Sequence, residues 1–295
     1  MTYRLDNIPI SEYGALPSPR NANEALAVTG AFSLPKRIGQ TERNWGTSIE
    51  PYVEKDDIEI DGRTLTFSVL IQADERLLKE KVEKYVNACV ACRKLSTDFD
   101  DFKVFCREKI EVQEHGTFAL VVARFKQPDF VLKPLVKAPS YTGAWQLEEY
   151  DLRKDFGIII AEKSSLESIA KRIESPTTEF YTQTEFRELS TVRINCSMIG
   201  SSVADLYDKI TQFQALLYKP ETRLLKLPYS GQIYFATVYF KDGFSAQIIH
   251  ENVIKFTLNA VVINVSNIDI WKQLRLTSAG TLRRLNGGSL RFINF

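Results

Sequence analysis

The sequence is poor in the residues from which most enzymes build a reactive centre. Its 295 residues include only four cysteines and two histidines. The cysteines are too few and too irregularly spaced for a disulfide framework, so we expect them to be reduced and buried. The 14 glycines are scattered and form no phosphate-binding loop, dinucleotide-binding fingerprint or nucleophile elbow. These absences argue against an enzyme, and we expect no catalytic residue, no cofactor and no metal.

Long apolar runs and an excess of one charge are also missing. No stretch approaches the roughly 18 uninterrupted apolar residues that span a bilayer, and residues 1–16 are polar where a signal peptide would be apolar. The formal net charge of +1 gives no overall attraction to nucleic acid or to anionic lipid. The sequence therefore predicts a protein that is assembled in the cytoplasm and does not act at a membrane.

Two pairs of residues could carry chemistry in another setting. Cys89 and Cys92 have the C-x-x-C spacing of zinc half-sites and thiol redox centres. They lie near the end of a predicted helix, where the dipole does not lower a thiol pKa, and no second pair completes a tetrahedral site. We expect Cys89 on the apolar stripe of the helix and Cys92 at its border. His115 and His250 are predicted in or beside hairpin turns, where their acidic neighbours point to the opposite face of the strand.

Two acidic runs could coordinate a hard cation. One contains Asp98, Asp100 and Asp101, and the other contains Asp56 and Asp57. Runs of this kind are more often solvated loops, which is our expectation here. A hydrolase that uses these carboxylates is the weakest of the functions that we consider.

The most informative pattern is a repeat of one strand and helix unit in the two halves of the chain. In the first half, apolar residues alternate over residues 65–71, and an apolar stripe at helical spacing covers residues 77–90. In the second half, the alternation covers residues 192–198 and the stripe covers residues 203–217. Strand and helix thus recur in the same order: Asp74 and Glu75 suit the start of the first helix, and Ser201 or Ser202 supplies a cap for the second.

The two units are offset by a nearly constant distance. Phe67 and Ile194 are 127 residues apart, and Val82 and Ile210 are 128 residues apart. Each helix is followed by predicted strands, the last of which is long and alternating. The alternative, that two unrelated strand and helix units look alike at this level, stays open, but duplication explains the order, the lengths and the offset together.

We expect four segments. Residues 1–135 form a first domain and residues 136–150 form a linker, which prolines and a glycine interrupt. Residues 151–265 form a second domain, and residues 266–295 form a C-terminal extension outside the repeat. The sequence therefore predicts an α+β protein with two strand-rich domains, each with a flanking helix.

The first half also has a recognisable layout. Its features in chain order are Leu5, Ile8 and Ile10 before Tyr13 and Gly14; a turn at Arg43, Asn44, Trp45 and Gly46; the alternating stretch from Ile58 to Ile71; the helix and aromatic strands; and a terminal strand ending at Phe125, Pro128, Asp129 and Phe130. In this layout, residues 1 to about 135 resemble the N-terminal domain of the distal tail proteins of siphophages, and of their relatives in prophages and contractile injection systems.

This resemblance implies a tail-tube-like fold, in which a small sandwich or split barrel with a flanking helix assembles side by side into a ring. The expected work is mechanical: a ring at the distal end of the tail tube, which connects the tube to the baseplate or the fibres and lets DNA or an effector pass. The expected place is the virion tail, assembled in the host cytoplasm. The expected partners are other copies of the chain and other tail tube, baseplate or fibre proteins.

The second half departs from many distal tail proteins, which continue with a carbohydrate-module-like domain. Tandem tube-like domains are instead similar to the central hub proteins of contractile tails, where three chains supply six domains. Three subunits, as a trimeric pseudo-hexamer, and six subunits, as a hexamer, both stay open.

We expect the contacts between subunits to involve aromatic strands and the basic C-terminal extension. The candidate interface residues are Tyr234, Tyr239, Phe240, Arg283 and Arg284. Aromatics on both faces of one strand indicate that both faces are covered, and another subunit could supply one of the covers. The extension could clasp the ring, although a frayed or self-packed terminus is an equal alternative.

A binding function is the alternative to a ring. Trp45 and Trp145 are predicted on loops, where their rings could stack on sugars. A carbohydrate-binding or adhesin-like module therefore stands as the second hypothesis from the sequence.

Overall fold

The computed structural model of this chain describes residues 2–21, 24–44, 49–163, 170–176, 181–187, 190–229 and 232–266. Within these ranges the chain is rich in strands and has few helices. The helices are η1 (Ile10–Tyr13), η2 (Lys55–Asp57), α1 (Glu75–Ala91), α2 (Leu152–Phe156) and α3 (Val203–Leu217), of which η1 and η2 are 3-10 helices. The predicted strand-rich α+β class is confirmed at this level.

The first half of the chain builds two sheets and a hairpin. Its strands are β1 (Arg4–Leu5), β2 (Ile8–Pro9), β3 (Ala15–Pro17), β4 (Val28–Thr29), β5 (Glu42–Asn44), β6 (Ile49–Pro51), β7 (Arg63–Gln72), β8 (Lys94–Ser96), β9 (Asp101–Lys103), β10 (Phe105–Cys106), β11 (Glu111–His115) and β12 (Phe118–Gln127). One sheet has the order β2-β1-β8-β9, and the other has the order β10-β12-β7-β3, with β11 on β12 and β4 on β7. The hairpin consists of β5 and β6.

The second half builds one larger, curled sheet and a second hairpin. Its strands are β13 (Gln146–Leu147), β14 (Tyr150–Asp151), β15 (Ile158–Lys163), β16 (Ala170–Pro176), β17 (Tyr181–Arg187), β18 (Ser190–Ile199), β19 (Arg223–Tyr229), β20 (Gln232–Tyr239), β21 (Ala246–His250) and β22 (Val253–Ser266). The sheet order is β14-β13-β19-β20-β22-β18-β15, with β21 on β22, and β16 pairs with β17. β13 lies within the expected linker, residues 136–150, yet it pairs with β19 and is part of this sheet.

In each half, the two long central strands bury one face fully and leave the other partly exposed, since Ser68, Val122 and Val261 on that second face are also buried. β7 and β12 pair along their full length, as do β18 and the matching part of β22. The buried face holds Leu65, Phe67, Val69, Ile71, Ala119, Val121, Ala123 and Phe125 in the first half, and Val192, Ile194, Cys196, Met198, Ile254, Phe256, Leu258 and Ala260 in the second. The predicted alternation is therefore confirmed, and each large apolar side chain contributes about 1.5–3 kcal/mol through burial.

The long helices cover these buried faces to different extents. α1 buries one narrow stripe, formed by Leu78, Val82, Tyr85 and Cys89 at helical spacing, and its remaining surface is largely open. α3 buries ten consecutive or near-consecutive positions, from Leu206 to Leu217. A helix that is buried all round must have partners on more than one side. α3 therefore packs against its own sheet and against something else.

Local signals fix where the elements begin and end. The predicted cap of α3 is confirmed at Ser202, whose Oγ accepts a hydrogen bond from the Asp205 amide at 3.2 Å. Asp151 caps α2 in the same way, with Oδ1 2.9 Å from the Arg153 amide. Gly14 ends η1 at φ 70° and Gly157 ends α2 at φ 69°, a left-handed conformation that glycine adopts without strain.

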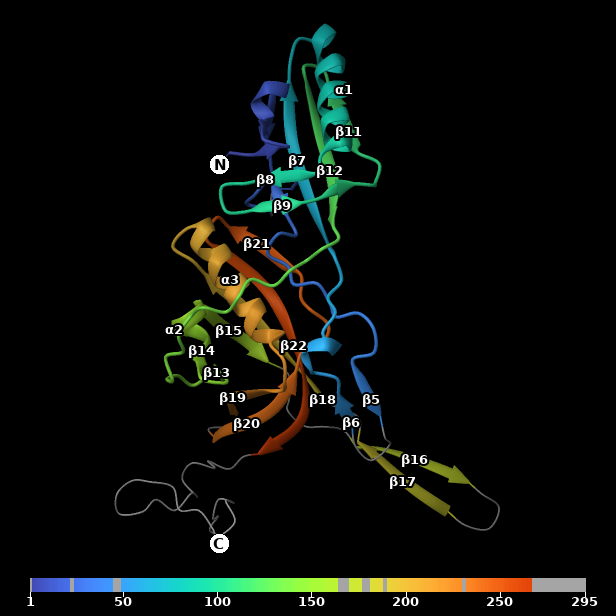
Figure 1. Ribbon diagram of the computed structural model, residues 1–295, viewed down its shortest axis with the longest axis vertical. Coiled ribbons are helices and arrows are strands. Elements are labelled where there is room, and N and C mark those ends of the chain that lie inside the picture. The colour runs from blue at the N-terminus through green and yellow to red at the C-terminus, as the bar shows by residue number, and fades with distance from the viewer. Residues whose placement is uncertain are drawn as a thin grey trace.

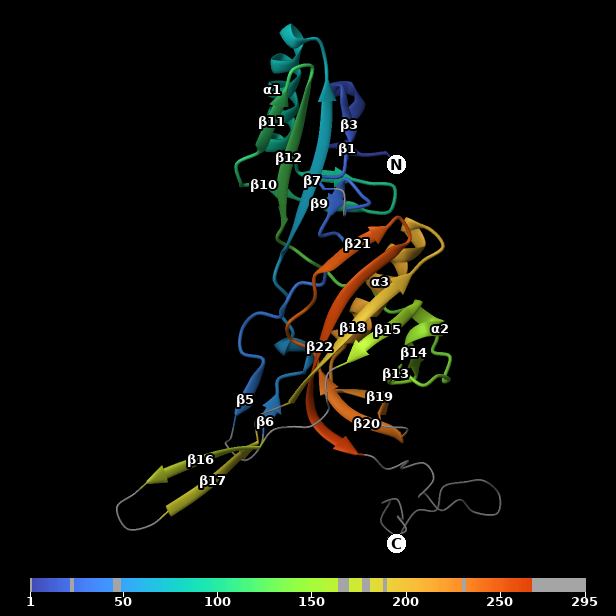
Figure 2. The ribbon, with the colours of Figure 1, turned by 180° about the vertical axis from the view of Figure 1, so that it is seen from behind.

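The two halves lie end to end along the longest axis of the described chain (Figure 1). Figure 2 shows the same arrangement from behind: the first half, with α1, lies above the second half, with α3. Residues between β4 and β7 descend from the first half and lie beside the second sheet in both views. The buried residues of both halves form one continuous hydrophobic core.

Candidate functional site

The contact between the two halves is the most elaborate polar and aromatic site in the described residues, and we call it the junction. From the first half it takes Phe32–Arg37, Glu42, Arg63, Phe99 and Asp100; from the second half it takes Tyr207, Gln214, Tyr218 and the stretch Tyr239–Ala246. Its chemistry determines what the contact can do.

Tyr207, on the first turns of α3, lies at the centre of the junction. Its ring contacts Phe99 at a centroid distance of 4.9 Å and meets Phe32 edge-on at 5.4 Å. Its hydroxyl donates to Asp100 Oδ2 at 2.7 Å and lies 3.4 Å from the Arg63 guanidinium. Burial raises the pKa of Tyr207 above its ordinary value, so the phenol stays protonated and donates.

A short segment of the first half, Phe32–Arg37, runs across the second half as an extra strand-like strap. Leu34 forms an antiparallel bridge with Phe244, with N–O distances of 2.9 Å in both directions. The Arg37 amide donates to the Lys241 carbonyl at 2.8 Å. Backbone pairing of this kind fixes the register of the strap without requiring particular side chains.

Polar side chains on α3 and directly after it complete the backbone bonds of the strap. Gln214 Nε2 donates to the Phe32 carbonyl at 2.9 Å, and the Tyr218 hydroxyl donates to the Pro35 carbonyl at 2.9 Å. Gln214 is only 1% exposed and Tyr218 only 3%. Buried polar groups that lose a partner are costly, so these bonds hold the strap in one place.

Glu42, an acidic residue of the first half, forms hydrogen bonds to the second half at one edge of the junction. The Glu42 carboxylate accepts hydrogen bonds from the Tyr239 hydroxyl and from Lys241 Nζ, the latter at 2.8 Å. Burial alone would raise the pKa of Glu42, but the hydrogen bonds from Lys241 and Tyr239 outweigh it and lower the pKa below its usual value. The carboxylate is therefore ionised at neutral pH.

The five residues expected at subunit contacts have different positions. Tyr239 is 2% exposed and Phe240 is 4% exposed, and both are covered by residues of the same chain. Tyr234 is partly buried and packs against the core. Arg283 and Arg284, with the rest of residues 267–295, lie outside the described residues. Around Tyr239 and Phe240 the aromatic strand is covered on both faces, but its junction face is covered there by the first half of its own chain.

The C-x-x-C pair has the surroundings of buried core residues. Cys89 is on the buried stripe of α1 and Cys92 follows the last residue of the helix, which confirms their predicted positions. Burial raises the pKa of Cys89 to about 12 and that of Cys92 to about 11. Thiols with such pKa values are protonated and unreactive at neutral pH.

The acidic runs make structural contacts. Asp100 pairs with Lys133 at 2.9 Å in addition to Tyr207, and Asp101 pairs with Lys94 at 2.8 Å. Asp57 closes the capping box of η2. Within the described residues, no group of three histidine, cysteine, aspartate or glutamate side chains converges as a metal site would require.

The predicted turn positions of the histidines are confirmed, because His115 ends β11 and His250 ends β21, each at the tip of a hairpin. Of the two tryptophans considered for sugar stacking, Trp145 is partly buried against the core, and Trp45 lies outside the described residues.

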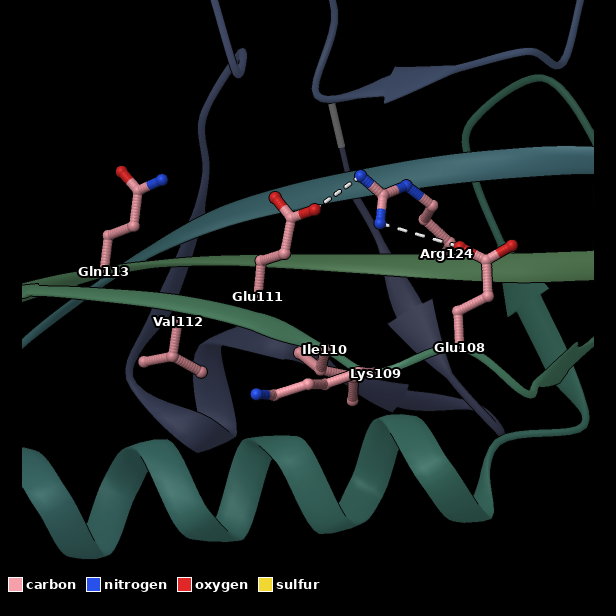
Figure 3. A pocket seen from close by; sticks show the side chains of 7 residues that line it. All are labelled: Glu108, Lys109, Ile110, Glu111, Val112, Gln113 and Arg124. Carbon is pink, nitrogen blue, oxygen red and sulfur yellow. Dashed lines mark hydrogen bonds and ion pairs between the residues drawn. The ribbon is translucent and has the colours of Figure 1, made fainter.

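The open faces of the two central sheets, apart from the buried Ser68, Val122 and Val261, are mostly polar. They carry Thr64, Thr66, Leu70, Leu120, Arg124 and Lys126 in the first half, and Thr191, Arg193, Asn195, Ser197, Lys255, Thr257 and Asn259 in the second. Figure 3 shows that Arg124 on this face is held between Glu111 and Glu108. The two ion pairs measure 2.5 Å and 3.6 Å.

The junction was not identified from the sequence, although one signal for it was present. The stripe of α3 is wide, because it includes Tyr207 and continues through Leu216 and Leu217, whereas the stripe of α1 is narrow. The width of an apolar stripe reports how many sides of a helix are covered. The strap has no comparable signal, because its bonds to the second half come mainly from the backbone.

No protein-family profile matches this sequence, and a comparison with curated proteins finds no significant match. In the part of the chain that the structure describes, no helix has the length and apolar character needed to cross a membrane.

Proposed function

We propose that this chain is a structural, ring-forming component of a phage, prophage or phage-like tail, placed at the distal end of the tail tube. It carries out no chemistry of its own. The ring connects the tube to baseplate or fibre proteins and surrounds a channel for DNA or an effector. Three observations support this proposal, and the junction is the strongest of them.

The first support is the correspondence between the two halves, which favours an internal duplication. The matching strand pairings are β1/β2 and β13/β14, β1/β8 and β13/β19, β8/β9 and β19/β20, β10/β12 and β20/β22, β11/β12 and β21/β22, β7/β12 and β18/β22, and β3/β7 and β15/β18. Seven pairings thus recur in the same order, whereas the pairing of β4 with β7 has no counterpart in the described part of the second half. A duplication would explain this recurrence, and the two tandem domains that we propose follow the expected ranges closely.

Equivalent residues also occupy equivalent positions. Gly14 and Gly157 both end a short helix in the left-handed conformation before the first sheet strand. His115 and His250 both end the strand that enters the last hairpin. Such agreement at the level of single residues is what a duplicated domain would retain.

The second support is that the junction joins different surfaces of the two units. The first half contributes the strap and Asp100, and the second half contributes α3 and the stretch from Tyr239 to Ala246. A contact between two different surfaces of similar units is heterologous, so it can repeat from unit to unit and close into a ring. Three chains with two units each would then give six units around the channel.

The third support is the polarity of the open sheet faces. Seven of the thirteen side chains named on these faces are threonine, serine or asparagine. Two of the four basic ones, Arg124 and Lys126, form ion pairs with acidic residues of the same chain. A channel lined mainly by hydrated polar side chains would offer little apolar surface for a passing effector to bind. These faces suit the lining of a passage.

The proposal is tested by counting chains in solution. Mass photometry of the purified protein from nanomolar to micromolar concentration, with sedimentation for higher concentrations, should show single chains giving way to closed assemblies of three. Open-ended growth without a preferred size would contradict a ring. Single chains at every concentration would contradict self-assembly and, with it, the proposed function.

A further inference from the structure

The duplication allows a residue-by-residue comparison of the two long helices. The residues before them, Asp74 and Ser202, are their N-caps, so positions on α1 and α3 are related by an offset of 128. Under this offset Lys79 matches Tyr207, Val86 matches Gln214 and Val90 matches Tyr218. Tyr207 and Gln214 on α3, and Tyr218 directly after it, contact the first half at the junction.

The neighbouring hairpins give a further match. Ala246 pairs with Phe256 in the second half and Val112 pairs with Val121 in the first, and Phe256 and Val121 are equivalent members of the two long strands. Ala246 therefore matches Val112. At the junction the Ala246 amide donates to Ser33 Oγ of the strap at 3.0 Å, and Ala246 is only 9% exposed.

The matching face of the first half is uncovered and partly apolar. Val90 is 54% exposed and Val112 is 38% exposed, whereas Tyr218 and Ala246 are buried under the strap. Between α1 and β11 there is an open groove, lined by Lys79, Val82, Glu83, Val86, Val112 and Glu114, which we call the α1 groove. Figure 3 shows that Val112 points to the α1 side of β11, while Glu111 and Gln113 point away from it.

We propose that the α1 groove is the docking site for a second copy of this chain, which presents its second half there as the first half presents its strap to α3. This inference rests on the proposed function, because it assumes that the contact seen within the chain recurs between chains. The groove corresponds to one side of that contact: α1 and β11 surround it as α3 and β21 surround the equivalent residues of the second half. Those equivalent residues are already covered by the first half.

The chemistry of the groove fits an extended segment of protein. Val82, Val86 and Val112 supply an apolar floor, and Lys79, Glu83 and Glu114 supply charges of both signs at its edges. A strand-like segment could place apolar side chains on the floor and align its own charges with the rim, a recognition mode in which backbone bonds give the register. Val112, which is exposed, would gain stability when it is covered.

The test uses two variants of the full chain. Val90→Glu together with Val112→Glu places one charge in the groove, at Val112, and one beside it, at the exposed Val90, without replacing a buried core residue. Val136→Glu is the matched control, because Val136 is 78% exposed in the stretch between the halves. Circular dichroism and thermal unfolding check that both variants are folded, and mass photometry with sedimentation follows assembly against concentration.

We expect the groove variant to require at least a tenfold higher concentration for assembly than the wild type, and the V136E control to match the wild type. The second half of the groove variant stays intact, so in a mixture it should bind wild-type chains and block ring closure. If the groove variant and the wild type assembled equally, the docking site would be overturned, but the proposed ring would still stand. Wild-type chains that stay single at all concentrations would overturn both proposals.

Discussion

Tyr207 offers the sharpest test of how the two halves hold together. Tyr207→Phe removes only the hydroxyl that donates to Asp100 at 2.7 Å, and hydrogen bonds to charged groups contribute about 1.5–3 kcal/mol. Asp100 keeps Lys133 at 2.9 Å, so we expect a loss of about 1.5 kcal/mol, at the lower end of that range. Tyr207→Ala also removes the ring from the aromatic cluster, and we expect a loss of about 3–5 kcal/mol.

Urea unfolding, followed by fluorescence and circular dichroism, measures both losses. Tyr13→Phe is the matched control: Tyr13 packs edge-on against Tyr85 within the first half, and we expect its change to stay within about 0.5 kcal/mol. The alanine variant should also separate the unfolding of the two halves, because the central contact of the junction is gone. If Y207F and Y13F changed stability equally, and Y207A cost less than about 1 kcal/mol, the junction would not be the coupling element that we describe.

Three further predictions concern backbone strain, pH and thiol reactivity. Gly157→Ala should lower the free energy of unfolding, measured in urea, by about 1–3 kcal/mol more than Gly14→Ala does. Both glycines have positive φ, but an added Cβ at Gly157 would collide with the Ile199 carbonyl oxygen. At Gly14 the added Cβ would meet only the flexible Lys81 side chain, at 3.2 Å. The pKa of Glu42 is lowered in the folded chain, so the ionised carboxylate stabilises the fold above the unfolded pKa of about 4.3, and this stabilisation is lost as pH falls through the folded pKa. Glu42→Gln should therefore lower the urea midpoint at pH 7 and much less at pH 3. An equal loss at both pH values would contradict this. Alkylation of the native protein at pH 8, followed by mass spectrometry, should modify the partly exposed Cys106 well before Cys89, because burial raises the pKa of Cys89 to about 12. Rapid labelling of Cys89 would show that α1 opens readily.

Periodicity made much of the fold predictable. The alternation around Phe67 and Ile194 and the apolar stripes of the two long helices come from side-chain burial, which acts on each element separately and leaves a local pattern. α2 was not predicted because its five residues are shorter than two helical turns. β19 also was not predicted, since its short run LLKLPY alternates only partly.

The junction was less predictable for a physical reason. The bridge between Leu34 and Phe244 consists of backbone hydrogen bonds, which any residue except proline can make, and it joins positions far apart in sequence. Aromatic residues near Tyr239 did indicate that both faces of β20 are covered. The pattern could not distinguish a cover supplied by another subunit from one supplied by the same chain, because both remove the same side chains from water.

Electron microscopy of the assembled protein tests the central claim most directly. Class averages of negatively stained particles, taken from the concentration range in which assemblies form, should show closed rings with a central hole and six similar units, with a mass of three chains. Compact particles without a hole, or filaments in which the junction-like contact repeats without closing, would contradict the account of this chain as a ring-forming component of a tail.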